Sequence, residues 1–458
     1  MKPKNPENKE NLKDDRRVED SMASRKGNND FITNQTSKRP NFKLELMEEV
    51  LEQSNLNAAF KRVRKNKGSA GVDGMSIDEL SDYLKKNGQT ICTQLLNGDY
   101  KPMPVKRVEI PKPDGGVRLL GIPTVLDRFI QQALAQVLQG GYDKTFSDSS
   151  FGFRPNRSAH QAVLKAQEYQ NEGHKFVVDI DLEKFFDKVN HDKLMGKLRK
   201  DIQDKRVLKL VRAYLNAGIM ENGIVTIPDE GTPQGGPLSP LLSNIVLDDF
   251  DRELEKRGHK FVRYADDCNI YVKTPRAGDR VMKSVKEFIE KKLKLKVNEK
   301  KSKVDKPAKR KFLGYSFFIW KGETGIRIAS ESIKRFKDKI RRLTRQRRIK
   351  FIDLINELRL LLIGWKNYFI LAKAQLVLRG LDEWIRHRLR SYIWQQWPKV
   401  RTRYKMLMKF GIDPDLAMQT AASGKGAWRV SNSPALLHAF PIMYFDKFKL
   451  PRLYHKKL

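Results

Sequence analysis

The chain has 458 residues, of which 39% are hydrophobic, and its 91 Lys and Arg against 55 Asp and Glu give a formal charge of +36. This length and hydrophobic content suit two or three folded domains and exclude a chain that is disordered throughout. The charge indicates a polyanionic partner such as nucleic acid, and two cysteines are too few for a disulfide framework or a four-cysteine zinc site.

The first segment, residues 1–41, is predicted to be a disordered polar tail. Lys, Asn, Asp and Glu dominate it, and its few apolar residues show no periodicity. It lacks the apolar stretch of a secretion signal. Apolar runs elsewhere, such as 360–363, are far too short to cross a bilayer. We therefore expect no membrane partner and a reducing, cytoplasmic compartment.

Helices and a hairpin are predicted to follow the tail. Apolar residues at helical spacing predict a helix from about residue 42: Leu44, Met47, Val50 and Leu51. Residues 103–122 are typical of a β-hairpin, because two alternating segments flank a turn, 111–116, that contains two glycines. A helical pattern begins after Pro123.

Two predicted β-segments carry carboxylates at their ends. A strand over 174–182 ends near Asp181, and a second hairpin, 261–272, has Asp266 and Asp267 at its tip. Between them, Ser239 is expected to cap a helix that Pro240 opens.

If the strand pairs with the second hairpin, three carboxylates meet at one edge of a sheet. Oxygen ligands of this kind suit Mg²⁺, and two such ions roughly 3.5–4 Å apart are what phosphoryl transfer requires. A solvated turn is the alternative for Asp266 and Asp267. Asp179 lies on the same strand face as Asp181. We expect it either to be solvated or to support the metal ligands without binding a metal itself.

Beyond residue 330 the pattern predicts helices only, and the charge is concentrated there. Residues 321–458 hold 31 basic and 10 acidic side chains, and 334–350 alone hold ten basic and one acidic. Four arginines fall outside the apolar stripe of this first helix: Arg341, Arg342, Arg345 and Arg348. They predict a surface that grips a phosphate backbone.

Six blocks of the sequence resemble, in order, those of the reverse transcriptases encoded by group II introns. The segment 264–267, Tyr-Ala-Asp-Asp, is similar to the family's Tyr-x-Asp-Asp box, and 181–187 to its first catalytic aspartate motif. Residues 231–240 resemble the loop that cradles template and nucleotide. The other blocks are 107–118, 151–156 and 312–315. The resemblance runs from about residue 42 to the end.

The resemblance implies an α+β fold of the right-hand polymerase type. Fingers and palm, with an antiparallel sheet, would occupy 42–320, and a helical thumb and maturase region 321–400. A small basic maturase segment would occupy 401–458. Many relatives continue into a DNA-binding segment and an endonuclease, which we do not expect here, so that insertion into DNA would use the intron RNA as the cutting strand.

The same resemblance assigns roles around the catalytic centre. Asp181, Asp266 and Asp267 would be catalytic metal ligands. Five residues would contact the incoming nucleotide: Lys112, Arg118, Phe186, Gln234 and Lys301. Lys112 and Arg118 would grip the triphosphate, and the Phe186 ring would exclude a ribose 2′-hydroxyl, while Phe185 would lie in the core. Lys301 would protonate pyrophosphate, with the adjacent Lys300 as the alternative.

Segments between 364 and 429 resemble the family's maturase part. They mix aromatic and basic residues, which suits a structured RNA. Arg386, Arg388 and Arg390 are the predicted contacts in this part. Trp365, Trp384 and Trp394 recur at helical spacing and are expected in the core instead.

The sequence therefore predicts an RNA-directed DNA polymerase of a bacterial cytoplasm that uses two Mg²⁺ ions, with Mn²⁺ as a substitute. Its predicted partners are an RNA template with a DNA primer, dNTPs, group II intron RNA and, through the intron ribonucleoprotein, target DNA. Two alternatives stay open: a reverse transcriptase repurposed for defence or repair, and a splicing factor with an inactive polymerase fold. A polymerase that makes RNA is disfavoured by Phe186.

Overall fold

The computed structural model describes residues 39–40, 42–111, 115–221, 223–226, 230–231, 235–345 and 349–454. The predicted tail, apart from Arg39 and Pro40, lies outside these residues, as do the predicted site residues Lys112, Gln234 and Arg348. The chain divides into two units, Met1–Arg39 and Pro40–Leu458, and the fold below is that of the second. Among the described helices, none has the length and apolarity that a membrane span requires.

The first helices are α1 (Leu46–Leu51), α2 (Gln53–Asn66) and α3 (Leu80–Asn97). The helix predicted from residue 42 is thus divided, because Glu52 adopts an extended ψ of 133° between α1 and α2. Met47 and Val50 are buried as predicted. Leu44 is 70% exposed, contrary to the prediction, because it lies before the first helical turn.

The predicted first hairpin is confirmed as β1 (Val105–Pro111) and β2 (Val117–Ile122), which pair antiparallel. It belongs to a four-stranded sheet of order β2-β1-β4-β5, completed by β4 (Ile219–Glu221) and β5 (Ile224–Thr226). The helix predicted after Pro123 is α4 (Val125–Tyr142), which begins where the Thr124 hydroxyl accepts a hydrogen bond from the Asp127 amide.

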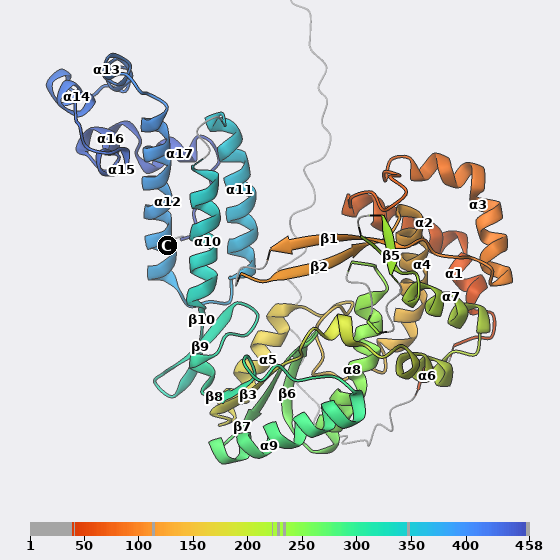
Figure 1. Ribbon diagram of the computed structural model, residues 1–458. Helices are drawn as coiled ribbons and strands as arrows, with labels where there is room; N and C mark the ends of the chain where they lie inside the picture. Colours follow the sequence, from red (N-terminus) through yellow and green to blue (C-terminus); the bar gives the residue numbers. More distant parts are fainter. Residues whose placement is uncertain are drawn as a thin grey trace, which may run out of the picture. The chain divides into compact units, whose positions relative to one another are not determined.

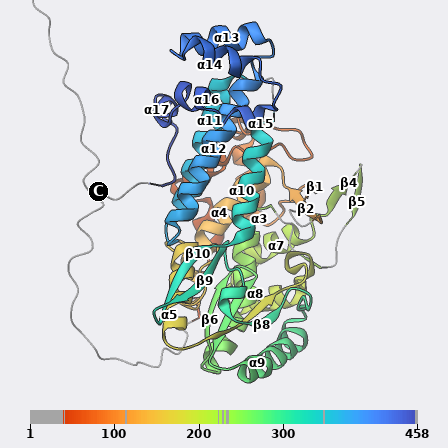
Figure 2. The ribbon, with the colours of Figure 1, turned by 90° about the vertical axis from the view of Figure 1, so that its left-hand side faces the viewer.

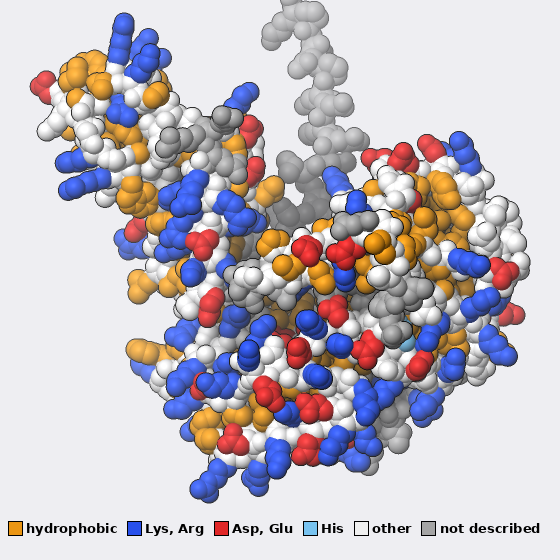
Figure 3. All heavy atoms as spheres, in the orientation of Figure 1, with side chains coloured by type: hydrophobic (Ala, Val, Ile, Leu, Met, Phe, Trp, Pro, Cys, Tyr) orange, Lys and Arg blue, Asp and Glu red, His pale blue; other side chains and the backbone are white. Residues whose placement is uncertain are grey.

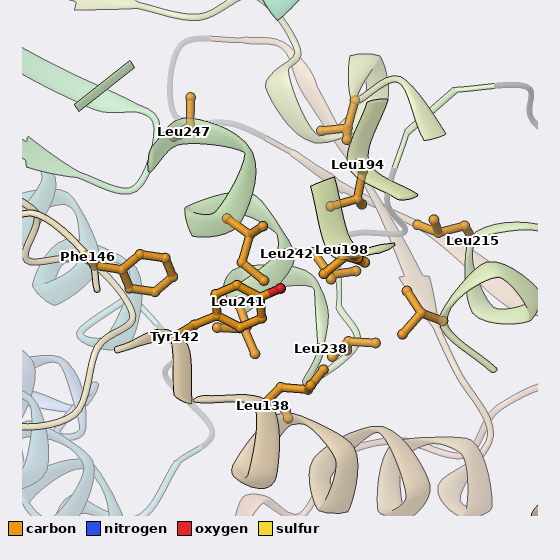
Figure 4. Close-up of a cluster of buried hydrophobic side chains, with 14 of the residues drawn as sticks. Leu138, Tyr142, Phe146, Leu194, Leu198, Leu215, Leu238, Leu241, Leu242 and Leu247 are labelled. Atoms are coloured by element: carbon orange, nitrogen blue, oxygen red, sulfur yellow. The ribbon is translucent and has the colours of Figure 1, made fainter. Parts of the chain in front are cut away.

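Four helices surround a leucine-rich part of the core (Figure 4). They are α4, α6 (His191–Asp201), α7 (Lys205–Leu215) and α8 (Ser239–Lys256). Helix α8 begins one residue earlier than predicted, because Leu238 occupies the cap position and Ser239 already belongs to the first turn with Pro240. Buried leucines from all four helices pack together in this region: Leu138, Leu194, Leu198, Leu215, Leu238, Leu241 and Leu242.

A second four-stranded sheet carries the predicted carboxylates (Figure 1). Its order is β6 (Lys260–Tyr264), β7 (Asp267–Val272), β3 (Phe176–Asp181) and β8 (Lys303–Asp305), and neighbouring strands are antiparallel. Alternate residues of β3 enter two different cores, so both of its faces are buried: Val178 and Ile180 pack in one, Val177 in the other.

Each face of this sheet is covered by different elements. Helix α9 (Pro275–Phe288), continued by the π-helical turn η2 (Ile289–Leu293), covers the face of Val178 and Ile180. Helix α5 (Ala159–Asn171) and the hairpin of β9 (Tyr315–Trp320) and β10 (Glu323–Ile328) cover the other face. Two short 3-10 turns, η1 (Phe185–Lys188) and η3 (Pro307–Lys309), flank the sheet.

From Ser330 onward the described residues form helices and connecting turns only, as predicted. Three long helices lie side by side in both views (Figures 1 and 2): α10 (Ser330–Leu343), α11 (Phe351–Tyr368) and α12 (Gln375–Gln395). Five short helices follow: α13 (Val400–Lys409), α14 (Pro414–Ala421), α15 (Ala427–Val430), α16 (Pro434–Ala439) and α17 (Ile442–Asp446). One buried cluster extends from Phe336 to Leu453, so the segments 321–400 and 401–458 contribute to the same core.

Candidate active site

The three predicted catalytic carboxylates lie at one end of the second sheet. Asp181, the last residue of β3, pairs with Asp267, the first residue of β7. Asp267 also pairs with Tyr264 at the end of β6, so only Ala265 and Asp266 form the turn between them. Ala265 takes a left-handed φ of +58°, a conformation that residues other than glycine rarely adopt. The chain therefore brings Asp181, Asp266 and Asp267 together as neighbours.

These carboxylates repel one another, because they lie close together in a partly buried environment. Burial, followed by the nearby Asp179, Asp266 and Asp181 carboxylates, raises the pKa of Asp267 to about 8. Burial also raises the pKa of Asp266; Asp181 adds to this rise, whereas the cations Arg118 and Arg263 oppose it. The site thus holds more negative charge than its surroundings balance, and a cation would relieve that excess.

Asp181, Asp266 and Asp267 offer oxygen donors only, the set that hard divalent cations prefer. In the described part of the chain, no three His, Cys, Asp or Glu side chains are already arranged around one point as a finished metal site. The three aspartates are therefore metal-ligand candidates that would have to close around an ion, with substrate phosphates completing its shell.

Lys301 and Arg310 supply positive charge on the β8 side of the site. The Lys301 Nζ lies 3.5 Å from Asp181 Oδ2. Arg310 donates from Nε to Asp179 Oδ2 over 2.8 Å and from Nη2 to the Lys301 carbonyl over 2.7 Å. Asp179 is only 8% exposed. It is thus a buried partner of Arg310, and the alternative of a solvated side chain is wrong.

Three of the residues predicted to contact the nucleotide are among the described residues: Arg118, Phe186 and Lys301. Phe186 is half-buried in η1, and its ring lies 5.3 Å from that of Phe185, which is buried in the core as predicted. Arg118 is exposed on β2, opposite Ile110. Lys112 and Gln234 lie outside the described residues. Next to the latter, Gly235 has a φ of +132°, and a Cβ there would lie 2.5 Å from the Gly121 oxygen of β2.

Sequence reasoning missed the residues that support the Asp266 turn from inside the protein. Arg263 of β6 is 1% exposed and forms a buried ion pair with Asp251 of α8. Asn244 of α8 and Gly152, in the loop before α5, complete the contacts around the turn. A charged residue within an apolar strand was the signal that could have found Arg263, because a buried charge requires a partner.

Arginines of the predicted phosphate-gripping surface lie at the end of α10. Lys and Arg side chains gather over this helix in the space-filling view (Figure 3). A shallow hollow there is lined by Asp338, Arg341, Arg342 and Arg345. Arg345 lies beyond the helix, which ends at Leu343, rather than on it. Arg341 is paired with Asp338, whereas Arg342 and Arg345 are exposed.

Two of the three arginines predicted to contact RNA on α12 are buried instead. Arg386 is 3% exposed and paired with Asp382, and Arg390 is 7% exposed and donates to the Ser431 carbonyl. Because their guanidinium groups point into the helical core, they present almost no surface to a phosphate, and their assignment as RNA contacts is not supported. Arg388 is half-buried and donates to the Thr344 hydroxyl.

The aromatic residues of this region divide between core and surface. Trp394 is 1% exposed, and Trp365 and Trp384 pack against the helical core, as predicted. Trp428 is 42% exposed. Its ring stacks on His387, with centroids 3.6 Å apart, and the Arg388 guanidinium lies 5.7 Å from its centroid. Trp428 and Arg388 thus place an aromatic ring beside a cation at the surface.

Two family models match the chain. Residues 110–317 match the family described as reverse transcriptase (RNA-dependent DNA polymerase), and residues 333–411 match the group II intron maturase-specific domain. The first match contains Asp181, Asp266, Asp267 and Lys301. The second contains all but the first three residues of α10, together with α11, α12 and α13.

Curated relatives match a little under half of this chain. Protein YkfC of Escherichia coli is 35% identical over 225 residues, which are 48% of this chain and 59% of the relative. The group II intron-encoded protein LtrA of Lactococcus lactis is 37% identical over 206 residues, 45% of this chain and 34% of the relative. The chain therefore spans less than two thirds of the length of each of these relatives. A solved Cas6-RT-Cas1–Cas2 complex is 28% identical and covers 54% of this chain and 42% of that chain, with a TM-score of 0.35.

Proposed function

The chain belongs to the group II intron reverse transcriptases and maturases, and from this premise we propose that it is an RNA-directed DNA polymerase that also binds group II intron RNA. One observation carries the polymerase proposal: Asp181, Asp266 and Asp267 are adjacent at the end of a buried antiparallel sheet, with Lys301 beside them. The inactive-polymerase alternative lacks support, because none of these side chains is missing.

In the proposed reaction, a primer 3′-hydroxyl attacks the α-phosphate of a dNTP, and pyrophosphate leaves. Reverse transcriptases are metal-dependent; divalent cations, which we propose to be two Mg²⁺, would supply charge neutralisation and a lowered pKa for the attacking hydroxyl. Asp181, Asp266 and Asp267 would hold them. Lys301, 3.5 Å from Asp181, would give a proton to the departing pyrophosphate.

Three further residues would select and hold the nucleotide: Arg118, Lys112 and Phe186. Arg118 acts on the Asp266 carboxylate electrostatically, which supports a place near the triphosphate. With Lys112, it would bind the phosphates through charge-assisted hydrogen bonds. The Phe186 ring would lie against the sugar and leave no room for a 2′-hydroxyl. An RNA template with a DNA primer and dNTPs would then be the substrates.

Primer extension on an RNA template with dNTPs tests the polymerase proposal. We expect Asp266→Asn to fall below about 1% of the wild-type rate, because the loss of ~3 kcal/mol of transition-state stabilisation is more than a hundredfold. The matched control is Asp249→Asn, the same change at an aspartate of α8 that pairs with Lys197 of α6. Equal rates for Asp266→Asn and wild type would contradict the metal site.

A role in binding intron RNA is supported by a separate observation. The end of α10 presents Arg342 and Arg345, and Arg345 lies near Arg388 of α12. These arginines belong to the maturase-matching region, and Arg388 lies beside Trp428, which follows that region in the sequence. Burial lowers the pKa of Arg388, and the nearby Arg341 and Arg345 lower it further. Asp338 pairs with Arg341 and, among the described residues, is the one carboxylate lining the hollow, so the cations there outnumber it. RNA phosphates would balance these cations, and an unpaired base could stack on Trp428.

Splicing of the flanking intron RNA at low Mg²⁺ tests this second role. We expect wild type and Asp266→Asn to accelerate splicing equally, because RNA binding would not involve the carboxylates. If neither does, the repurposed reverse transcriptase is favoured.

The salt dependence of RNA binding tests the arginines themselves. The double change Arg342→Gln and Arg345→Gln should reduce the slope of log affinity for the intron RNA against log salt concentration by about 1–2. Lys283→Gln, at an exposed lysine of α9, should leave the slope unchanged.

A further inference from the structure

Arg263 has an unusual environment for an arginine. Its side chain is 1% exposed, and that of its partner Asp251 is fully buried. The guanidinium forms a two-point ion pair with this carboxylate, from Nε to Oδ1 over 2.7 Å and from Nη2 to Oδ2 over 2.5 Å. A buried ion pair of this kind adds little net stability compared with apolar side chains of similar size. Its presence therefore calls for a role other than stability.

The remaining nitrogen of Arg263 points at the catalytic turn. Nη1 donates to the Ala265 carbonyl over 2.9 Å and to Asn244 Oδ1 over 3.0 Å. Ala265 is the residue in the left-handed conformation, which costs a non-glycine residue about 1–2 kcal/mol. A charge-assisted hydrogen bond to its carbonyl offsets that cost. Because Ala265 directly precedes Asp266, its orientation sets the direction in which both catalytic carboxylates leave the turn.

The same contacts fasten the turn to the loop before α5. Asn244, which holds Arg263 Nη1, donates from its Nδ2 to the Gly152 carbonyl over 2.9 Å. The Phe151 amide donates to the Arg263 carbonyl over 2.9 Å. A Cβ at Gly152 would collide with the Ala265 amide nitrogen and lie 3.0 Å from the Tyr264 carbonyl carbon. The turn is thus enclosed by backbone on one side and held by Arg263 on the other.

We propose that Arg263, locked by Asp251 and Asn244, is a positioning residue that holds the Ala265 turn so that Asp266 and Asp267 meet Asp181 around the metal ions. The proposal rests on the polymerase function proposed above. Arg263 touches no substrate in this arrangement and acts through the backbone of the turn. Its positive charge also opposes the rise in the pKa of Asp266.

Arg263→Lys tests the proposal, because it retains the charge and the burial. A single ammonium lacks the planar fork that reaches a carboxylate, an amide oxygen and a carbonyl together. We expect the binding of Mn²⁺ alone, measured by calorimetry without substrate, to weaken about tenfold, which is ~1.4 kcal/mol. Amide hydrogen exchange at 265–267 should accelerate. The kcat for primer extension should fall while the KM for dNTP stays within about twofold, since ground-state nucleotide contacts are untouched.

The matched control is Arg206→Lys in α7, whose guanidinium forms ion pairs with Glu48 and Asp204 and has no hydrogen bond to the turn among the described residues. It should lose stability and leave Mn²⁺ binding and exchange at 265–267 unchanged. If Arg263→Lys behaves like this control, Arg263 is merely structural and the proposal is wrong.

Asn244→Ala provides a milder test if Arg263→Lys does not fold. It keeps the ion pair with Asp251 but removes the amide that holds Nη1. A smaller loss of Mn²⁺ affinity, about threefold, with faster exchange at 265–267 would support the proposal, and unchanged exchange would overturn it. A wild type that binds Mn²⁺ without extending primers would contradict the polymerase function alone, and the exchange results would still decide the role of Arg263.

Discussion

Phe186 is the residue on which nucleotide selection depends in the proposed function. Its half-buried ring should occupy the space that a ribose 2′-hydroxyl would need. We expect Phe186→Ala to reduce the preference for dNTPs over rNTPs, as the ratio of kcat/KM values, by at least about tenfold, or ~1.4 kcal/mol. Phe185→Leu, at the buried neighbour, should lower the melting temperature without changing this ratio. An unchanged ratio in Phe186→Ala would remove the steric assignment.

Asp248 is predicted to make stability depend on pH. Burial raises its pKa to about 6, although Lys197 and Arg252 oppose the rise. A carboxyl with a raised pKa in the folded state binds its proton more tightly there, so the free energy of unfolding decreases as pH rises from about 4 to 6. Asp248→Asn removes this loss. We expect the variant to exceed wild type by about 1–2 kcal/mol above pH 6 and to have no advantage below pH 4.

Calorimetry at pH 4 and pH 7 measures this difference. The control is Asp249→Asn, at the neighbouring aspartate, which should show almost no difference at either pH. An equal effect of Asp248→Asn at both pH values would mean that packing, and not ionisation, governs this position.

Single residues differ in how far the sequence could predict them. The positions of Asp181, Asp266 and Asp267 at the end of a strand and at a hairpin tip were predictable from alternation and turn residues, whereas their catalytic roles stay predictions. Arg386 was placed wrongly, because helical periodicity shows which residues share a face but not whether a long side chain turns inward. Asp382, four residues before it, was a readable sign of a buried pair.

Gly152 controls how closely the loop before α5 can approach the Ala265–Asp266 turn. A Cβ there would meet backbone atoms of Tyr264 and Ala265, which cannot rotate away as a flexible side chain can. We expect Gly152→Ala to cost about 1–3 kcal/mol of stability, as overpacking does. Its polymerase rate should fall more than about tenfold, because the displaced turn carries Asp266.

The matched control is Gly140→Ala in α4, where an added Cβ would meet nothing within 4 Å. It should be neutral or stabilising by up to about 1 kcal/mol, since alanine favours a helix. A Gly152→Ala variant as active as Gly140→Ala would show that the contact does not matter for catalysis.

Elements with local signals were predicted well, and breaks without local signals were not. The first hairpin and the strand ending at Asp181 were recognisable from alternation and turn glycines. No glycine or proline marks the break at Glu52 or the end of α10 at Leu343. At the latter, the Thr344 hydroxyl donates to the Ile340 carbonyl, and this side chain–backbone contact leaves no periodic trace in a sequence.

Phe369 connects the helical region to the sheet that carries the carboxylates. It follows α11 directly, and its ring lies 4.8 Å from Trp365 and 5.1 Å from Tyr315 of β9. It is 8% exposed and packs in the cluster that covers one face of the sheet. We expect Phe369→Ala to cost about 3–5 kcal/mol locally, through lost burial and a residual cavity.

Differential scanning calorimetry is the measurement for Phe369→Ala. The helical region has its own core, from Phe336 to Leu453. Weakening the contact that Phe369 makes with the sheet should therefore separate thermal unfolding into two transitions. Trp320→Ala is the control, since this ring is 68% exposed on the same hairpin and should change stability by no more than about 0.5 kcal/mol. A single transition at a lower temperature in Phe369→Ala would argue against independent cores.

At the level of the whole molecule, the order of motifs predicted the fold class, the α+β part followed by helices. The shared core of 321–400 and 401–458 was not predictable, because an apolar stripe shows that a face is buried but not which partner buries it. Phe440 and Phe445 illustrate this: they are fully buried, yet they pack in the same cluster as Leu358 and Leu389, far earlier in the chain.

The contact between Gly152 and the Ala265 turn also limits which amino-acid substitutions such a protein can accept as it evolves. The two segments are distant in the sequence but share one tight packing contact, so a substitution in one alters which substitutions the other tolerates. Chimeras that exchange residues 260–272 without 149–157 should lose activity more often than chimeras that exchange both. Mutant libraries for altered substrate use or fidelity should therefore vary both segments together.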